Sequence, residues 1–294
     1  MQTVSIASGT GMGAVEIAIT DAERALRFYR DYIGLTPLPS AGPELRMGAH
    51  GRELVVLHPG AERPVVAHTS GLYHLAILVP DRKELARVIG RLARLRWAQS
   101  PTDHVMTKAN YLWDPDGNGI EIYTESPEDG FMGFANGTFA AWDKDGNPRS
   151  GRDPIDLEEL FTHLSDDDPL DQPMPAGTKM GHVHLHVPDV EEALRFYHDL
   201  VGFDVMGNVP GVGFVSAGGY HHHLGLNEWA GRAVKPAPPG AAGLRRFTVE
   251  LPTRRDLEDV VGRLEHADVR VQEQADGFAA ADPSANSVLF RTAT

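Results

Sequence analysis

Residues Met12–Leu35 read MGAVEIAITDAERALRFYRDYIGL, and residues Met180–Phe203 read MGHVHLHVPDVEEALRFYHDLVGF. The two stretches align without gaps and share 12 of 24 residues, which indicates an internal duplication. Each copy starts with the alternation typical of a β-strand and continues with the apolar spacing of an amphipathic helix. Asp21 and Asp189 stand where the N-cap of that helix is expected. The chain therefore consists of two related halves.

Each helix of this repeat is expected to end at Gly34 or Gly202, because glycine readily adopts the left-handed cap conformation. A second repeat follows, in which residues 71–95 (GLYHLAILVPDRKELARVIGRLARL) match residues 243–267 (GLRRFTVELPTRRDLEDVVGRLEHA). It again contains a strand and a helix with an apolar stripe. The chain thus contains four units, numbered one to four, each with one strand, one helix and about three short strands. The clearest short strands are expected at residues 44–47, 53–58, 110–113, 119–124, 213–217, 221–227, 278–281 and 287–292.

A unit of this size cannot bury the inner face of its own sheet, so the units are expected to pair into curved sheets with helices outside. The predicted fold is α+β, with four βαβββ modules in two domains and cupped mixed sheets. The expected domains are residues 10–125 and 179–294. Residues 126–178 form a connector that is rich in Asp, Gly and Pro, with one short helix expected at Asp156–Leu164.

Composition excludes several classes of partner and site. The net charge is −14 without long basic runs, which argues against nucleic acid and anionic membranes. No stretch approaches eighteen apolar residues and the N-terminus lacks a leader pattern, so no membrane span and a cytoplasmic location are expected. The chain has no cysteine but 14 histidines, so any metal site must use imidazole and carboxylate ligands.

The first strands of the four units show where ligands could lie. The residues at the equivalent position are Ala14, His74, His182 and Arg246. One such histidine would ordinarily be a packing residue, but two at the same repeat position favour a shared role. On the last strand, unit two has Glu121 where unit four has Leu289. The sequence therefore predicts a site made by units two and three together, with His74, Glu121 and His182 as metal ligands.

Residues 103–123 hold the most specific motif. His104 is followed by Tyr111, by an Asp-Pro-x-Gly turn at residues 114–117 and by Glu121. This order, together with the four βαβββ units, resembles the vicinal oxygen chelate superfamily and, within it, the two-domain extradiol dioxygenases that cleave catechols. The stretches at residues 180–185 and 218–226 support the same resemblance.

The resemblance implies a non-haem Fe(II) centre, for which Mn(II) could substitute, and a small aromatic diol and O2 as substrates. Two histidines and one carboxylate leave three adjacent positions of an octahedral ion open. By resemblance, His222 in the last strand of unit three acts as acid and base. His223 is the alternative, because a shift of one residue reverses the strand face. Tyr111 would hydrogen-bond a substrate oxygen, with His104 beside it.

Two rival functions remain open at this stage. One is a glyoxalase-like metal-dependent isomerase or lyase, because fold alone does not fix chemistry. Such sites commonly carry a second acidic ligand from the partner unit, and that position is expected within residues 221–223, which favours the dioxygenase. The other is a metal-free protein that binds an aromatic ligand, which the retention of three ligand-type residues disfavours. The sequence does not set the ring substituents, and a homo-oligomer stays open.

Overall fold

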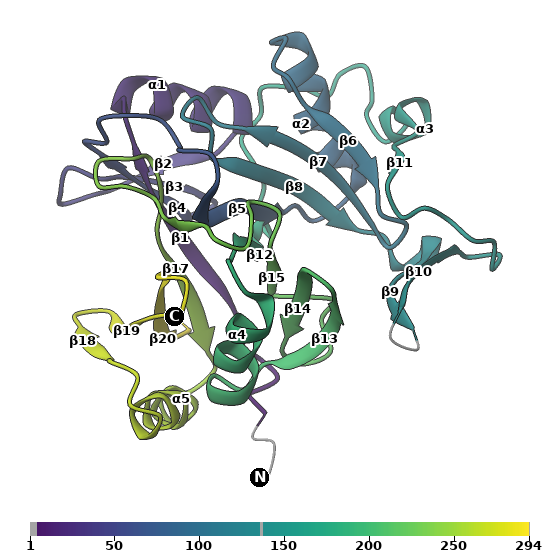
Figure 1. The fold of residues 1–294 in the computed structure, drawn as a ribbon. Coiled ribbons are helices and arrows are strands. Elements are labelled where there is room, and N and C mark those ends of the chain that lie inside the picture. Colours follow the sequence, from purple (N-terminus) through teal and green to yellow (C-terminus); the bar gives the residue numbers. More distant parts are fainter. Residues whose placement is uncertain (1–4, 136–137, 294) are drawn as a thin grey trace.

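The computed structural model describes residues 5–135 and 138–293. It contains the four predicted βαβββ units (Figure 1). Unit one comprises β1 (Gly11–Ile19), α1 (Ala22–Arg27) with its π-helical continuation η1 (Phe28–Ile33), β2 (Thr36–Leu38), β3 (Leu45–Ala49) and β4 (Arg52–Pro59). Unit two comprises β5 (Thr69–Leu78), α2 (Arg82–Arg94), β6 (Ser100–Asp103), β7 (Thr107–Trp113) and β8 (Gly119–Glu125).

The second half repeats this order. Unit three comprises β12 (Lys179–His186), α4 (Val190–Leu194) with its π-helical continuation η3 (Arg195–Leu200), β13 (Asp204–Val209), β14 (Val212–Ser216) and β15 (Leu224–Asn227). A short β16 (Lys235–Pro236) precedes unit four, which comprises β17 (Gly243–Leu251), α5 (Arg254–His266), β18 (Gln272–Gln274), β19 (Gly277–Ala281) and β20 (Ser287–Thr292).

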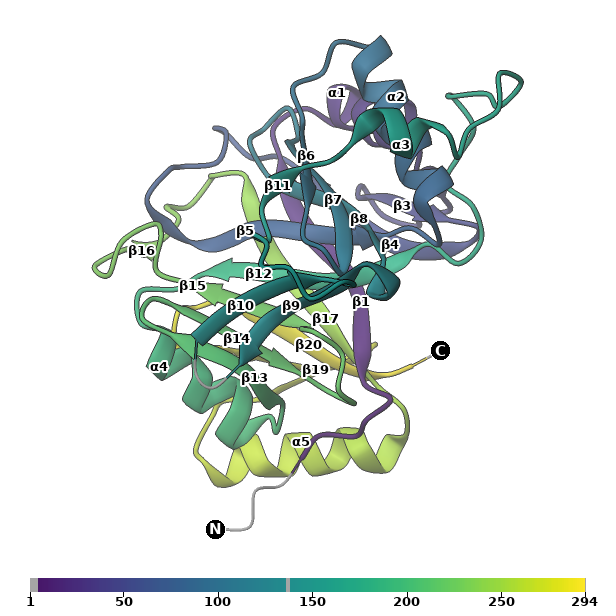
Figure 2. The same ribbon diagram turned by 90° about the vertical axis from the view of Figure 1, so that its right-hand side faces the viewer.

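Side-chain caps fix where the helices begin. The carboxylate of Asp21 accepts a hydrogen bond from the backbone N–H of the third residue after it, and Asp189 does the same, as predicted. The helical segment of unit one ends at Gly34, whose φ of 94° is the expected left-handed cap, and Gly202 has a φ of 99°. The helices pack outside the sheets in both views (Figure 2).

Each of the two large sheets combines one unit from each half of the chain. Units one and four form the sheet β18-β19-β20-β17-β1-β4-β3-β2. Units two and three form the sheet β11-β6-β7-β8-β5-β12-β15-β14-β13, with β16 beside β5. The predicted pairing of units two and three is therefore confirmed. The domain boundaries at residues 125 and 179 stay a prediction.

Within each half, a buried tyrosine of the first helical segment is tied to an Asp-Pro turn of the second unit. The phenol of Tyr29 donates to Asp114 at 3.1 Å, and the phenol of Tyr197 donates to Asp282 at 2.9 Å. The second oxygen of each aspartate accepts backbone N–H groups of its own turn. The turn in the dioxygenase-like motif thus has a structural counterpart in the other half of the chain.

The connector is more structured than the sequence indicated. Its helix α3 spans Leu157–Phe161, with Asp156 as N-cap, which is shorter than the predicted Asp156–Leu164. The connector also contains a 3-10 turn, η2 (Pro127–Asp129), the hairpin of β9 (Gly130–Ala135) and β10 (Thr138–Asp143), and a short strand β11 (Asp153–Pro154). Strand β9 of this hairpin lies beside β13 of unit three (Figure 2). None of the described helices is both long and apolar enough to cross a membrane.

One predicted strand is wrong at its start. Residues 221–227 were expected to be extended throughout, but β15 begins at Leu224 and His221, His222 and His223 lie in the loop before it. This loop starts with Gly218 and Gly219, whose φ angles of 62° and 76° turn the chain away from the strand direction. The three histidines therefore lie in a loop and not in a hydrogen-bonded β-strand.

Candidate metal centre and active site

Three of the predicted site residues meet on the face of the sheet shared by units two and three. His74 lies on the central strand β5, which pairs in parallel with β8, carrying Glu121, and antiparallel with β12, carrying His182. All three side chains are buried, with residue exposures of 4%, 3% and 2%. Neighbouring strands in this register bring side chains of one face to contact distance.

The ligand-type atoms of these residues form a small triangle. The Nε2 atoms of His74 and His182 are each 3.0 Å from one carboxylate oxygen of Glu121 and 3.3 Å from each other. An octahedral ion with bonds of about 2.1 Å would hold neighbouring ligand atoms about 3.0 Å apart. Two imidazoles and a carboxylate are a donor set for a first-row divalent metal. The residues therefore fit such an ion, and their role as ligands stays a prediction.

Protonation states also suit metal binding, which needs neutral imidazole and ionised carboxylate. Burial lowers the pKa of His74, although the carboxylate of Glu121 acts in the opposite direction. Burial alone would raise the pKa of Glu121, but the imidazoles of His182 and His74 together hold it well below its usual value. The Nδ1 atoms of His74 and His182 are buried without a hydrogen-bond partner among the described residues, and it is the Nε2 atoms that face Glu121.

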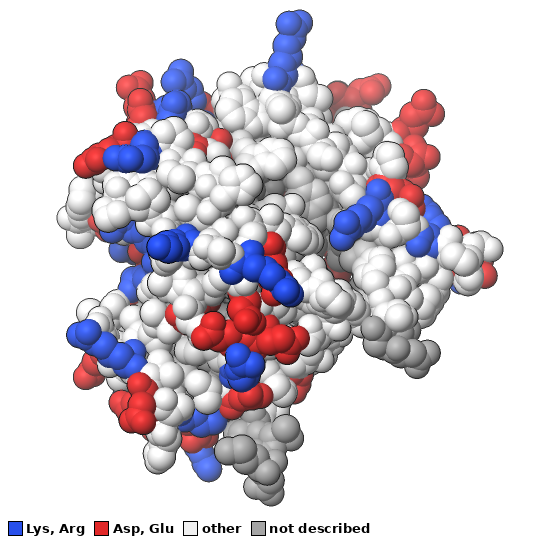
Figure 3. Space-filling view, in the orientation of Figure 1, with Lys and Arg blue, Asp and Glu red and all other residues white. Residues whose placement is uncertain are grey.

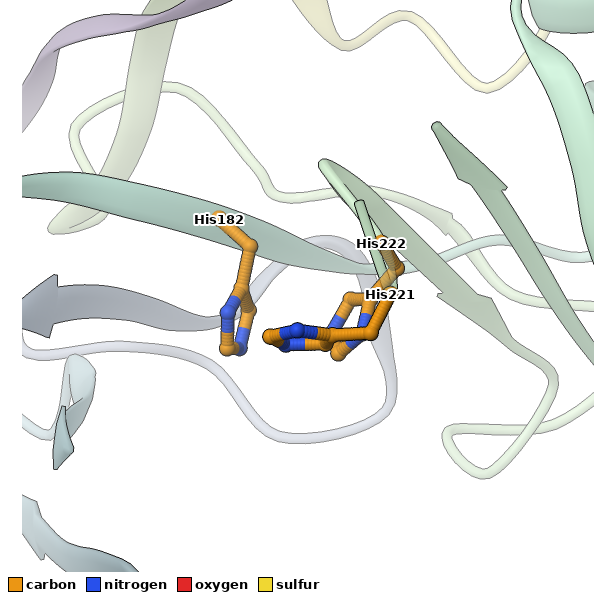
Figure 4. Close-up of side chains that lie close together, drawn as sticks. All are labelled: His182, His221 and His222. Atoms are coloured by element: carbon orange, nitrogen blue, oxygen red, sulfur yellow. The ribbon is translucent and has the colours of Figure 1, made fainter. Parts of the chain in front are cut away.

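His222 and His221 approach this triangle from the loop before β15. The ring centroid of His182 lies 4.2 Å from that of His222 and 6.0 Å from that of His221. Figure 4 shows the three rings gathered in one place, with the two loop histidines directed toward His182. Their ligand-type atoms also lie within 4.8 Å of one another, so this trio is a second candidate metal cluster that shares His182.

His223 is turned away from the cluster. Its Nδ1 accepts a hydrogen bond from the backbone N–H of Ala217 at 3.2 Å and lies 2.9 Å from the hydroxyl of Ser216. Since Nδ1 accepts, the proton of the neutral ring is on Nε2 and the hydroxyl also donates. Of the two alternatives left open by the sequence, the structure places His222 beside the triangle and gives His223 a bond to its own loop.

Tyr111 and His104 form a hydrogen-bonded pair next to the triangle. The phenol of Tyr111 is 2.8 Å from Nε2 of His104, whose Nδ1 is 2.6 Å from the carbonyl oxygen of Gly151 in the connector. Because a carbonyl can only accept, Nδ1 carries the proton in the neutral ring and Tyr111 donates to Nε2. Tyr111 is also the cross-strand partner of Glu121. The sequence did not indicate that the connector would hold His104.

Five aromatic side chains, two of which belong to the triangle, form a closed circle of ring contacts. Successive centroid distances are 4.2 Å from His182 to His222, 4.9 Å to Phe214, 5.8 Å to His184, 5.0 Å to His74 and 5.4 Å back to His182. Aromatic surfaces of this kind suit a flat apolar ligand. Figure 3 shows that the surface between the body of the molecule and the β9–β10 hairpin is formed mostly by residues other than Lys, Arg, Asp and Glu.

The position equivalent to Glu121 in unit three is Gly225. The parallel pairing of first and last strands places Gly225 in unit three where Glu121 lies in unit two. A Cβ atom there would lie 2.8 Å from the ring of His184, so this position has no room for a side chain. The expected location of a second acidic position, within residues 221–223, is therefore wrong. At the true equivalent position this chain supplies no fourth ligand.

The sheet of units one and four has no comparable set among the described residues. At the position of His74 it carries Arg246, which forms ion pairs with Glu16 and, at 3.2 Å, with Asp276. The second oxygen of Glu16 is 2.7 Å from Nε2 of His58. These charged groups of the sheet of units one and four pair with one another, which is typical of a structural ion-pair network.

The buried loop histidines predict acid sensitivity of the metal-free protein. Burial lowers the pKa of His221 to about 3 and of His223 to about 4, while unfolded histidine titrates near 6.5. Below about pH 6.5 the unfolded chain takes up protons that the folded chain cannot, so stability is complete above that pH and falls as the pH decreases.

Urea unfolding of the metal-free protein at pH 7, 6 and 5 measures this effect. The expected loss is about 1.4 kcal/mol per histidine for each pH unit below about 6. The variant His223→Asn keeps an acceptor for the N–H of Ala217. Its free energy of unfolding should fall by about 1.4 kcal/mol less per pH unit than that of the wild type. A free energy of unfolding that is constant from pH 7 to pH 5 would contradict the buried, neutral state of these rings.

Comparison with known proteins agrees with this architecture. The model of the Glyoxalase/Bleomycin resistance protein/Dioxygenase superfamily matches residues 11–122 and 179–280. The chain belongs to this superfamily. As a member of it, the chain is 39% identical over 292 residues to the catechol-2,3-dioxygenase of Bacillus subtilis (strain 168), covering 97% of this chain and 98% of that protein. It is an enzyme of the dioxygenase type.

Solved structures of other proteins share this fold. A protein of Bacillus subtilis subsp. subtilis str. 168 that carries a provisional dioxygenase name has a TM-score of 0.64 at 14% identity, over 98% of this chain and 86% of that chain. Glyoxalase I from Zea mays has a TM-score of 0.57 at 13% identity, over 97% and 92%. At these identities, the likeness shows the two-domain α+β fold alone.

Proposed function

We propose that the protein cleaves the ring of a catechol or substituted catechol next to its two hydroxyl groups, using O2 and an Fe(II) ion held by His74, Glu121 and His182. The ligand triangle, with Gly225 where a fourth ligand would lie, carries this proposal. Three protein ligands on one face leave room for both diol oxygens and O2. A four-ligand site of the isomerase kind would lack that room.

Bound iron would supply the redox chemistry that joins O2 to the diol, and Mn(II) could replace it. Both atoms of O2 enter the ring-opened product, so the reaction needs no external reductant. The protein supplies the dry, aromatic surroundings and the positions of the polar groups. The aromatic side chains of Phe214 and His184 would pack against the substrate and hold it beside the triangle.

His222 is the proposed acid and base. Burial, followed by the nearby imidazole of His182, holds its pKa well below the usual value, so the ring is neutral at neutral pH. A neutral imidazole can accept a proton from a substrate hydroxyl and return it to an oxygen atom later in the reaction. His221, from the same loop, lies farther from His182.

Tyr111 is the proposed contact for a substrate oxygen. Its own proton is donated to His104, so the phenol oxygen is left as an acceptor for a substrate hydroxyl. Burial, followed by the charge of Glu121, raises the pKa of Tyr111 well above its usual value, so the phenol stays protonated. His104 would act through Tyr111 by fixing the direction of that proton.

The test is an oxygen-uptake assay. Protein purified and loaded with Fe(II) under anaerobic conditions is mixed with catechol, and air is then admitted. We expect a yellow ring-opened product and the uptake of one O2 per catechol, with neither in metal-free protein. If several catechols bind equally well with and without metal and no oxygen is consumed, the proposal is wrong and a metal-free binding protein is the better description.

A further inference from the structure

Two tyrosines and a glutamate form a hydrogen-bonded chain that joins unit two to the histidine loop, residues 217–223. The hydroxyl groups of Tyr123 and Tyr220 lie 2.5 Å apart, and Tyr220 donates to the carboxylate of Glu125 at 2.7 Å. Because the proton of Tyr220 goes to the carboxylate, Tyr123 donates to the oxygen of Tyr220. Tyr123 and Glu125 follow Glu121 on the same strand, β8.

This chain is one of two anchors that hold the histidine loop. At the other end, the backbone N–H of His223 donates to Val215, and its carbonyl accepts from the N–H of Val183 on β12. His221 and His222 lie between the two anchors. Nδ1 of His221 is 3.7 Å from the same oxygen of Glu125 that accepts from Tyr220, so this carboxylate faces both the anchor and the loop. The ring of His222 packs against His182 and Phe214, and the anchors keep its loop in place for these contacts.

The phenol of Tyr123 fits next to the proposed ligand His182 because residue 181 is a glycine. A Cβ atom on Gly181 would lie only 1.9 Å from the hydroxyl oxygen of Tyr123, so the phenol occupies the place of a side chain at residue 181. The ring of Tyr123 lies 5.0 Å from that of His182. Tyr123 is fully buried, and a buried phenol without a partner would be costly. Tyr220 is that partner.

We propose that Tyr123, Glu125 and Tyr220 are positioning residues that hold His222 against the triangle of His74, Glu121 and His182. The chain links the strand that carries Glu121 to the loop that carries His222, so ligand and acid–base group are fixed relative to each other. A group displaced by about 1 Å can lose on the order of a hundredfold in rate. This inference rests on the proposed function for its kinetic part only.

The central experiment compares Tyr220→Phe with the control Tyr197→Phe. Both changes remove a phenol that donates to a carboxylate, but Tyr197 lies in η3 and bonds to Asp282 in the Asp-Pro turn of unit four. For Tyr220→Phe we expect unchanged metal content, a KM for catechol within twofold and a kcat at least tenfold lower. For Tyr197→Phe we expect lower thermal stability with kcat unchanged.

Hydrogen exchange of the backbone amides in residues 217–223 gives a readout that needs no turnover. It should be at least tenfold faster in Tyr220→Phe than in the wild type and unchanged in Tyr197→Phe. As a rescue test, Glu125→Gln keeps an oxygen acceptor for Tyr220 and should retain most of the activity, whereas Glu125→Ala should resemble Tyr220→Phe.

Equal kcat values in wild type and Tyr220→Phe, or unchanged exchange in the histidine loop, would overturn the positioning role. A loss of metal in Tyr220→Phe would also overturn it, because the residue would then support the triangle. If the wild type cleaves no catechol, the proposed function fails, while the exchange comparison still decides whether the anchor holds the loop.

Discussion

Glu121→Ala is expected to lose its metal. The carboxylate of Glu121 is the only acidic member of the triangle, and both histidine Nε2 atoms are directed at one of its oxygens. Loss of a residue that only hydrogen-bonds a metal ligand typically costs 10- to 100-fold in metal affinity, so loss of this proposed ligand should cost more than about 100-fold. Metal analysis after gel filtration should give about one ion per chain for the wild type and almost none for the variant.

Glu16→Ala is the matched control for this experiment. Glu16 is also a carboxylate on the face of a large sheet, with a histidine at 2.7 Å, but its sheet offers no candidate metal cluster among the described residues. The variant should keep full metal content and ring-cleavage activity, with lower stability from the broken ion pair. Full metal content in Glu121→Ala would show that the triangle is not the metal site.

His222→Ala is expected to keep the metal and lose turnover. The imidazole of His222 lies next to His182 but outside the triangle, so its removal leaves all three proposed ligands in place. General acid–base catalysis typically contributes 10²- to 10⁴-fold, and kcat should fall by about that factor. Steady-state oxygen uptake, with metal content measured on the same samples, checks this result. His223→Asn should retain far more activity, because His223 faces Ser216 and Ala217.

The metal content of His222→Ala also distinguishes the triangle from the alternative cluster of His182, His221 and His222. If that trio holds the ion, His222→Ala should lose metal to the same extent as Glu121→Ala, and His221→Ala should do so as well. Retention of metal in both loop variants would assign the ion to the triangle. The two clusters share only His182, so the remaining residues separate them.

Repeats carried most of what the sequence could predict about the fold. A residue such as His74 is ambiguous alone, but its alignment with His182 and the contrast of Glu121 with Leu289 predict one candidate site in units two and three. The pairing of those units followed from the same comparison, since only two of the four first strands carry a histidine. Apolar periodicity and N-cap residues were sufficient to predict where helices begin, because helix starts depend on local contacts.

Features that depend on contacts between distant segments were not predictable. Residues 221–223 directly precede the residues of β15, and the sequence predicts one strand over 221–227, whereas the positive φ angles of Gly218 and Gly219 turn the chain so that the three histidines lie in a loop. The partner of His104 is a carbonyl in the connector, which no side-chain pattern reveals. The equivalence of Gly225 to Glu121 could be found only from the strand register. Gly225 pairs with His184, whose ring leaves no room for a side chain at residue 225.

A crystal structure of anaerobically Fe(II)-loaded protein, with anomalous scattering recorded at the iron edge, tests the central claim most directly. The account predicts one strong peak within bonding distance of His74, Glu121 and His182, with His222 near it but not bound. A peak bound by His221 and His222 without His74 and Glu121, or a peak on the sheet of units one and four, would contradict it.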